Sequence, residues 1–281
     1  MATPLRIATV NVNGVRASFR NGMGPWLDKR GIDILALQEV RASTEDLENL
    51  LGAEWDILHD AATAKGRAGV ALASRNKASI HRVALGADDF DSAGRWLEAD
   101  YEVGGTIVTV VSTYVHSGEA GTPKQVQKYK FLDAMTKRMP DLEQHNPLAV
   151  IVGDLNVGHR ELDIRNWKGN RTSAGFLPKE RAYFDRFFSP VRKRTEGADG
   201  VKRIGLGWVD VGRQWAGEVD GPYTWWSARG QAFVNDVGWR IDYQVATPEL
   251  AAKVKNYTVD RAASYEERWS DHAPVVVDYD I

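Results

Sequence analysis

Apolar residues in this chain come in short runs that stop at glycine, asparagine or aspartate, and the pattern recurs along the whole sequence. Apolar runs of this length bounded by turn-forming residues are typical of β-strands. They predict strands at seven places, namely 6–10, 33–37, 68–74, 106–115, 149–152, 240–247 and 273–281. The chain is therefore expected to be built around β-sheets.

Helices are expected between some of these runs, at Pro25–Arg30, Thr44–Leu51, Pro123–Arg138 and Pro178–Phe188. Pro123, Pro140 and Pro178 stand where helix boundaries are expected, because proline suits the first turn of a helix and cannot continue one. No linker rich in proline, glycine or serine divides the chain, which predicts one domain over residues 1–281. Strands mixed with helices throughout predict an α/β layered fold, sheet on sheet with helices outside.

The composition narrows the possible partners and chemistries. Lys and Arg total 36 against 38 Asp and Glu, a formal net charge of -2, so a polyanion would have to meet a local basic patch. The absence of cysteine excludes a disulfide scaffold, a thiolate zinc site and a catalytic thiol. The first residues lack a signal-peptide pattern, and no apolar run approaches a membrane span, which favours a cytoplasmic protein with no membrane partner.

Polar side chains stand at the ends of most predicted strands. They are Asn11, Asn13, Gln38, Glu39, Tyr114, His116, Asp154, Asn156, Asp242, Asp271 and His272. Taken singly, an Asp or Asn after a strand is most often a turn former, and a lone His is most often an ordinary hydrogen-bonded residue. So many around one sheet are harder to explain in this way, because layered α/β folds place their chemistry at strand ends. A functional site is expected there.

The residue types indicate the chemistry of that site. Carboxylate and amide oxygens suit hard cations such as Mg²⁺ or Mn²⁺, whereas zinc would favour more His or Cys. The sequence contains no GxxxxGK[ST] loop, no GxSxG turn and no HExxH helix. Metal-assisted attack of water on a phosphate ester is the reaction class that fits best.

An ordered set of motifs then gives a resemblance. It includes "NVNGVRA" (11–17), "LALQEVRA" (35–42), "GDLNVGHRELDIRNWKGN" (153–170), "VGWRIDYQVAT" (237–247) and "SDHAP" (270–274). With these, the chain resembles the exonuclease III family of abasic-site endonucleases, within the endonuclease/exonuclease/phosphatase superfamily, over nearly its whole length. The resemblance implies a four-layered α/β sandwich, two mixed β-sheets packed face to face with helices outside, and a site at one rim of the sheets.

The resemblance also implies residue roles. Glu39 would be the principal metal ligand, aided by Asn11 and Asp271, and the wider ligand set for one or two ions would include Asp154, Asn156 and His272. Asp154 would orient or deprotonate the attacking water, and Asn156 would position that water. His272, paired with Asp242, would contact the scissile phosphate. Tyr114 would contact it either as a hydrogen-bond donor or as a phenolate.

DNA contacts are expected from the charged segment after Asp154, where basic side chains can neutralise phosphates. The residues assigned to DNA binding are Arg160, Arg165, Lys168, Asn170, Arg171 and Ser117. A merely solvated surface is the alternative for this segment. A second basic cluster, at 192–194 and 202–203, is as easily a solvated face as a DNA contact.

An apolar pocket for an extruded abasic sugar is implied at Trp225, Trp239 and Ile241, because indoles would exclude an intact base. The alternative is that both tryptophans are core residues. Five other tryptophans are expected to be packing residues, namely Trp96, Trp167, Trp208, Trp215 and Trp269.

Three positions depart from the family pattern. The usual Tyr-x-Pro-Asn reads "YVHS" here, so His116 and Ser117 replace a proline and an asparagine, which puts one phosphate contact in doubt. Asn13 stands where some relatives have Asp.

The expected function is a Mg²⁺- or Mn²⁺-dependent DNA repair nuclease, an exodeoxyribonuclease III or AP endonuclease. It would cut duplex DNA 5′ to abasic sites and process 3′ ends, acting as a monomer in the cytoplasm of a bacterial-type cell, at the nucleoid during repair. The alternatives are another phosphodiesterase or phosphatase of the superfamily, or a catalytically weak DNA-binding member.

Overall fold

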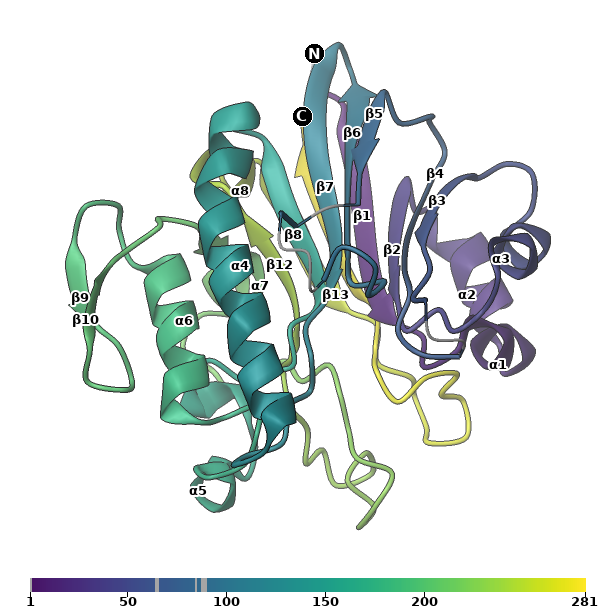
Figure 1. Ribbon diagram of the computed structural model, residues 1–281. Coiled ribbons are helices and arrows are strands. Elements are labelled where there is room, and N and C mark those ends of the chain that lie inside the picture. Colours follow the sequence, from purple (N-terminus) through teal and green to yellow (C-terminus); the bar gives the residue numbers. More distant parts are fainter. Residues whose placement is uncertain (1, 64–65, 84, 87–89) are drawn as a thin grey trace.

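Two six-stranded sheets form the centre of the computed structural model, which describes residues 2–63, 66–83, 85–86 and 90–281 (Figure 1). The first sheet has the order β13 (Val254–Val259), β14 (Val275–Asp280), β1 (Pro4–Asn11), β2 (Ile34–Gln38), β4 (Val70–Ser74), β3 (Asp56–Asp60). The second has the order β11 (Val209–Asp210), β12 (Asp242–Ala246), β8 (Ala149–Asp154), β7 (Thr106–Tyr114), β6 (Trp96–Val103), β5 (Ile80–Arg82). A separate ribbon pairs β9 (Arg194–Glu196) with β10 (Lys202–Ile204).

Each large sheet is mixed, with one parallel pair near its centre. These pairs are β1 with β2 and β7 with β8, and the flanking pairs are antiparallel. Because strand side chains alternate between faces, each sheet presents one apolar face to the other sheet and one to helices. Ile7 and Leu72 of the first sheet lie in the same core cluster as Val110 and Val152 of the second.

Helices cover the two outer faces, which completes a four-layered sandwich (Figure 1). The first sheet packs against α1 (Val15–Arg20), α2 (Met23–Arg30) and α3 (Thr44–Leu51). The second packs against α4 (Pro123–His145) and α6 (Pro178–Phe188). The remaining helices are short, namely a 3-10 turn (Glu161–Asp163), α5 (Trp167–Asn170), α7 (Val211–Ala216) and α8 (Pro248–Ala251).

Polar side chains also join the two sheets across their interface. The Gln38 amide of β2 donates to the Ser112 hydroxyl of β7 at 3.1 Å. The Gln244 amide of β12 donates to the carbonyl of Ile7 in β1 at 2.9 Å, and its amide oxygen accepts from the Tyr279 hydroxyl at 2.8 Å. These bonds fix the register of one sheet over the other, because buried polar groups must be paired.

The structure confirms the expected fold, with strands at all seven predicted places and helices at all four. The boundary role of Pro140 was wrong, because α4 continues through it to His145. Pro140 is exposed, and the apolar face formed by Leu132, Met135, Met139 and Leu142 runs past it. Burial of that face therefore outweighs the cost of an internal proline, about 3 kcal/mol.

No helix in the described part of the chain is both long enough and apolar enough to cross a membrane.

Candidate active site

The polar ends of the central strands meet at one rim of the sandwich. Asn11 ends β1, Tyr114 ends β7 and Asp154 ends β8, and these strands run toward the same edge. Asp242 begins β12, whose antiparallel pairing with β8 places it directly opposite Asp154. The segment with Asp271 and His272 precedes β14, which runs antiparallel to β1 and so begins at the same rim.

A cleft of about 450 Å³ opens at this rim. Its lining is formed by Glu39, Tyr114, Ser117, Gly118, Asp154, Asn156, Ser173, Ala174, Gly175, Trp225, Trp239, Ile241, Asp271 and His272. Most of the residues assigned above to catalysis, metal binding and the sugar pocket therefore share one cavity. Asn11 and Asp242 are buried directly beneath it, bonded to Asp154 and His272.

Two carboxylates approach each other across the amide of Asn11. Its Nδ2 donates to Glu39 Oε1 at 2.9 Å and to Asp154 Oδ2 at 3.0 Å. The other oxygen of Glu39 is paired with Arg41. Glu39 holds a left-handed backbone with φ 52°, a conformation that costs a non-glycine residue energy and that clusters at functional sites. Two carboxylates thus meet near one point, and carboxylate oxygens suit a hard divalent cation.

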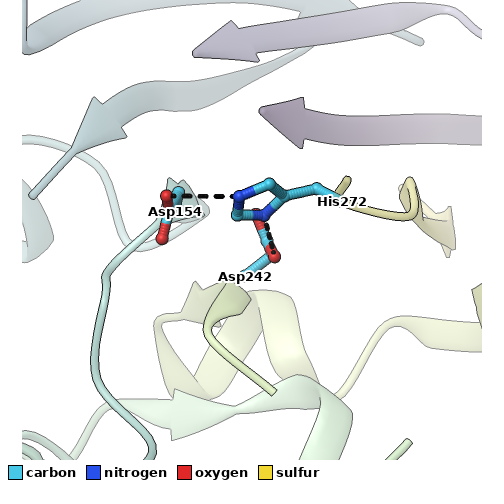
Figure 2. A group of neighbouring side chains, drawn as sticks. All are labelled: Asp154, Asp242 and His272. Atoms are coloured by element: carbon cyan, nitrogen blue, oxygen red, sulfur yellow. Dashed lines mark hydrogen bonds and ion pairs between the residues drawn. The ribbon is translucent and has the colours of Figure 1, made fainter. Parts of the chain in front are cut away.

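His272 lies between two buried aspartates (Figure 2). Its Nδ1 is 2.8 Å from Asp242 Oδ2, and its Nε2 is 3.9 Å from Asp154 Oδ2. Burial lowers the pKa of His272, but attraction to Asp242 and Asp154 outweighs it and raises the pKa to about 10, so the ring is protonated at neutral pH. Burial, reinforced by Asp242 and Glu39, raises the pKa of Asp154 to about 7 against the opposing effect of His272.

One ligand atom from each of Asp154, Asp242 and His272 lies within 4.8 Å of the others, a grouping that could hold a metal ion. Asp242 and His272 are already paired, and Asp242 Oδ1 is buried without a hydrogen-bond partner among the described residues. Glu39 and Asp154 line the cleft itself, and each of their carboxylate oxygens accepts a hydrogen bond or forms an ion pair. A divalent cation between these carboxylates would favour the ionised form of Asp154, which burial and the charges of Asp242 and Glu39 disfavour.

Asn156 is held against Asp154 by its own backbone. It has φ 51°, its N–H donates to Asp154 Oδ1 at 2.9 Å, and its Nδ2 donates to Asp154 Oδ2 at 3.0 Å and to the Val115 carbonyl at 3.0 Å. Gly153 precedes this turn with φ 142°, and an added Cβ would lie 2.0 Å from the Thr113 carbonyl oxygen. Only glycine fits there, so the "GDLN" turn requires it.

A buried ion pair that the sequence did not reveal supports three walls of the cleft. Lys128 Nζ lies 2.6 Å from Glu180 Oε1 and donates to the carbonyls of Ser117 at 3.1 Å and Asn156 at 2.7 Å. Glu180 Oε2 accepts from the backbone N–H groups of Gly175 at 2.7 Å and Leu177 at 2.9 Å. The sequence offered one hint of this pair: Lys128 falls on the apolar face of α4, and a buried lysine needs a buried partner of opposite charge.

Tyr114 is a neutral phenol. Burial, together with the charges of Glu39 and Asp154, raises the pKa of Tyr114 far above its usual value, which favours the hydrogen-bond donor over the phenolate. The Arg95 guanidinium lies 4.6 Å from the Tyr114 ring centre and donates to its carbonyl at 3.0 Å. His116 packs against Phe131 with ring centres 5.5 Å apart, and burial lowers its pKa to about 3, so it acts as an uncharged packing ring.

Trp225 and Trp239 form one side of the cleft, with their rings 6.1 Å apart and nearly perpendicular. Ile241 lies beside them and is buried. Gly175 faces Trp239, and a Cβ there would lie 3.0 Å from its ring, so a side chain would narrow the pocket. The Trp225 indole N–H donates to Asp271 Oδ2 at 3.0 Å, and the Asn13 amide donates to Asp271 Oδ1 at 3.0 Å.

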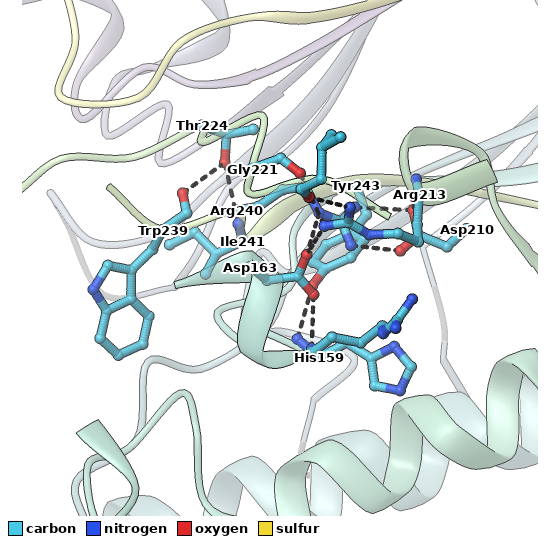
Figure 3. A network of polar contacts seen from close by, with 12 residues as sticks. His159, Asp163, Asp210, Arg213, Gly221, Thr224, Trp239, Arg240, Ile241 and Tyr243 are labelled. Carbon is cyan, nitrogen blue, oxygen red and sulfur yellow. Dashed lines mark hydrogen bonds and ion pairs between the residues drawn. The ribbon is translucent and has the colours of Figure 1, made fainter. Parts of the chain in front are cut away.

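Behind this wall lies a buried network of two arginines and two aspartates (Figure 3). Arg240 binds Asp163 at 2.8 Å and Asp210 at 2.6 Å, and Arg213 binds Asp163 at 2.5 Å. The Arg240 backbone N–H donates to the Asp163 carbonyl at 2.7 Å. Because Arg240 stands between Trp239 and Ile241, the network attaches the segment that carries Asp163 to the pocket wall.

That segment contains all the residues assigned to DNA binding except Ser117, and, unlike Ser117, they do not line the cleft. Arg160 and Arg165 pair with Glu218 and Asp220, Lys168 and Arg171 lie over the Trp167 ring, and the Asn170 amide donates to the Asn166 carbonyl. The helix α5 within it projects at the same end of the molecule as the rim (Figure 1).

The second basic cluster lies on and beside the β9–β10 ribbon, along the outer side of α6 (Figure 1). Trp96 and Trp208 are buried, as expected, and Trp269 packs on Trp26 with ring centres 5.4 Å apart. A packing role for Trp215 was wrong, because its side chain is 49% exposed.

Comparisons with known proteins agree with this geometry. The family model described as Endonuclease/Exonuclease/phosphatase family matches residues 8–272. An exodeoxyribonuclease of Bacillus subtilis is 29% identical over 272 residues, covering 96% of this chain and 98% of that protein. The 3′ phosphatase NExo from Neisseria, solved with a product DNA hairpin, is 27% identical with a TM-score of 0.81, over 99% of this chain and 100% of its own. An AP endonuclease from Archaeoglobus fulgidus is 26% identical with a TM-score of 0.78 and the same coverage.

Proposed function

The chain belongs to the Endonuclease/Exonuclease/phosphatase family, and on this premise we propose that it is a DNA repair nuclease that cuts duplex DNA 5′ to abasic sites and processes 3′ ends. The observation that carries the proposal is the meeting of Glu39, Asp154 and His272 in one cleft walled by Trp225 and Trp239. The relatives named exodeoxyribonuclease and AP endonuclease are nucleases, and NExo is a 3′ phosphatase. Both activities are phosphoester hydrolysis, so one site serves both.

The family depends on divalent metal, and Mg²⁺ or Mn²⁺ is the ion we propose. Glu39, Asn11, Asp154 and Asp271 would hold a first ion. Of the groups expected at a second ion, Asp154 and Asn156 are available, because His272 is protonated and bonded to Asp242. The bound cation would polarise the phosphoryl oxygens and stabilise the leaving oxyanion.

Asp154 is the group we propose as base for the attacking water. Its raised pKa, to about 7, places it close to neutral pH, where a general base works best. Asn156 is bonded to both oxygens of Asp154 and would orient the water beside it. Asp242 holds His272 through Nδ1, which leaves the protonated Nε2 to bind a phosphate oxygen, and Tyr114 would donate its hydroxyl to the same phosphate.

The two tryptophans in the wall of the cleft support selection of a nucleotide that lacks its base. A sugar without a base is cheap to extrude and fits beside two indoles, whereas an intact nucleotide brings a ring that the indoles exclude. Duplex DNA would lie across the rim and along the segment from Arg160 to Arg171, with Ser117 contacting phosphate inside the cleft. We expect one chain, 1–281, to act as a single-domain monomer, at the nucleoid of a bacterial-type cytoplasm.

An incision assay tests the proposal. A labelled duplex with one abasic site is incubated with the protein and Mg²⁺, beside a sample with excess EDTA, an intact duplex and a duplex ending in a 3′ phosphate. Cleavage 5′ to the abasic site that EDTA abolishes is the expected result. Cleavage of none of these duplexes, together with hydrolysis of inositol phosphates or lipid headgroups, would assign the chain to another branch of the superfamily.

A further inference from the structure

Both arginines at the start of the DNA-binding segment are already paired with carboxylates. Arg160 Nη1 and Nη2 lie 2.6 Å from Glu218 Oε1 and Oε2, a two-pronged pairing. Arg165 Nη1 lies 2.9 Å from Asp220 Oδ2. A planar carboxylate held by two guanidinium N–H groups has the geometry in which arginine binds the two free oxygens of a phosphate. The carboxylates therefore engage guanidinium N–H groups that a phosphate would otherwise bind, two on Arg160 and one on Arg165.

The loop that carries these carboxylates, 217–221, is fixed by hydrogen bonds from Arg213. Arg213 is buried, and its guanidinium donates to the carbonyls of Gly217 at 2.8 Å, Val219 at 2.7 Å and Gly221 at 2.8 Å. Its Nη2 also binds Asp163, within the arginine-bearing segment (Figure 3). The Gly221 backbone N–H donates to the Leu162 carbonyl at 2.8 Å.

These buried bonds join the loop to the arginine segment independently of the two surface ion pairs. If DNA displaced Glu218 and Asp220 from their arginines, the loop backbone would stay beside the same segment. The two negative charges would then remain close to the incoming phosphates. They would continue to compete with those phosphates for the guanidinium groups.

The surface location of the pairs allows this exchange. Arg160 and Glu218 are 38% and 72% exposed, and Arg165 and Asp220 are 54% and 56% exposed. Exposed ion pairs contribute little to folding, so DNA can replace them without disturbing the structure. Their net effect should therefore fall on the affinity for DNA.

We propose that Glu218 and Asp220 compete with DNA backbone phosphates for Arg160 and Arg165. This competition lowers the affinity of the chain for intact duplex DNA. The inference rests on the proposed DNA-binding function. It identifies two acidic residues, outside the catalytic cleft, as part of the DNA-binding surface.

The test removes the two charges without changing the shape of the side chains. Binding of a fluorescently labelled intact duplex is measured by anisotropy over a range of KCl concentrations, in EDTA so that no cleavage occurs. The variant Glu218→Gln/Asp220→Asn is compared with Glu102→Gln/Glu249→Gln. The control makes the same change of net charge at exposed positions on β6 and α8, at the far ends of the sheets.

We expect the first variant to bind duplex roughly two- to thirtyfold more tightly than wild type, and the control to bind like wild type. The slope of log affinity against log salt should steepen by up to about 0.9 for each arginine that gains a phosphate. In an Arg160→Ala/Arg165→Ala background, the same two acidic substitutions should give little gain, because the arginines through which they act are gone.

An equal gain in the control variant, or no gain in Glu218→Gln/Asp220→Asn, would overturn the inference while leaving the DNA-binding function intact. A gain that persists in the arginine-deleted background would also overturn it, because the effect would then be general repulsion. Failure of the wild type to bind duplex at any salt concentration would instead refute the proposed function itself.

Discussion

Asp154 and Asp242 lie directly opposite each other in the antiparallel pairing of β8 with β12. Two carboxylates so close could not both stay ionised without a cation, and the imidazole of His272 lies between them. The shorter contact, 2.8 Å, goes to Asp242, and the longer, 3.9 Å, goes to Asp154. The two aspartates therefore differ in position, since Asp242 is paired with the imidazole beneath the cleft and Asp154 lines the cleft itself.

Asp154→Asn should therefore abolish chemistry and spare binding. The substitution keeps the shape of the side chain but removes its charge and its ability to accept a proton. Single-turnover incision of an abasic duplex should fall by at least roughly 10²-fold, with duplex affinity within a few-fold of wild type. Weaker binding with an unchanged single-turnover rate would contradict the role of Asp154 as base.

Glu39→Gln should weaken metal binding and lower activity severely. The variant removes one of the two carboxylates that meet across Asn11, and an amide is a poorer ligand for a hard cation. Mn²⁺ affinity, measured by calorimetry or electron paramagnetic resonance without DNA, should fall roughly tenfold or more. Glu102→Gln, an exposed carboxylate far from the rim, is the control. Full incision in excess EDTA would refute the metal requirement.

Two tryptophan variants distinguish the proposed sugar pocket from the hydrogen bond that Trp225 donates to Asp271. Trp239→Ala should reduce the ratio of abasic to intact cleavage, because it opens space beside the sugar. Trp225→Phe keeps an aromatic wall but loses the N–H that binds Asp271 Oδ2, so it should lower the incision rate more than the discrimination. Unfolding must be measured alongside, because loss of a Trp side chain can cost roughly 3–5 kcal/mol. Wild-type discrimination in a folded Trp239→Ala variant would place damage recognition elsewhere.

The buried network behind the pocket predicts a loss of stability in acid. Burial opposes ionisation of Asp163, but Arg240 and Arg213 outweigh it and lower its pKa to about 2 from 3.8. A carboxyl group whose pKa is depressed on folding stabilises the fold above its unfolded pKa, and this contribution is lost as the pH falls through the folded pKa. It should be complete above about pH 4 and disappear toward pH 2, and amounts to about 2 kcal/mol.

Urea unfolding of wild type and Asp163→Asn at several pH values checks this. The difference in unfolding free energy should be constant from pH 7 to about pH 5 and shrink below pH 4. A difference that does not depend on pH would mean that Asp163 acts through hydrogen bonds alone.

The strands and the rim were predictable because their signal is local. An apolar run such as Ala149–Val152 indicates a strand wherever it lies, and polar residues at several such ends indicate a site. The strand β6 was missed because Glu98 and Asp100 interrupt its apolar pattern. Both are buried, and both are neutralised by residues far away in sequence, Glu98 by Arg82 and Arg138 and Asp100 by Arg82.

The supports of the site were hidden for the same reason. Lys128 and Glu180 are separated by a strand, a loop and α5, so neither shows its partner in the local sequence. The carboxylates of Glu218 and Asp220 could likewise not be placed against Arg160 and Arg165, because a tertiary loop brings them together. Residue types at strand ends predict chemistry, whereas pairing across layers requires the fold.

The site is divided between the two sheets, with Asn11 and Glu39 on the first and Tyr114, Asp154 and Asp242 on the second. Its geometry therefore depends on how one sheet is seated on the other, which contacts such as that between Gln38 and Ser112 determine. A slip of about 1 Å between the sheets would leave every strand hydrogen bond intact and still misalign the reacting groups. Catalysis should thus fail at lower denaturant concentrations than secondary structure, and loss of activity would be the earliest sign that the two halves of the sandwich have begun to loosen.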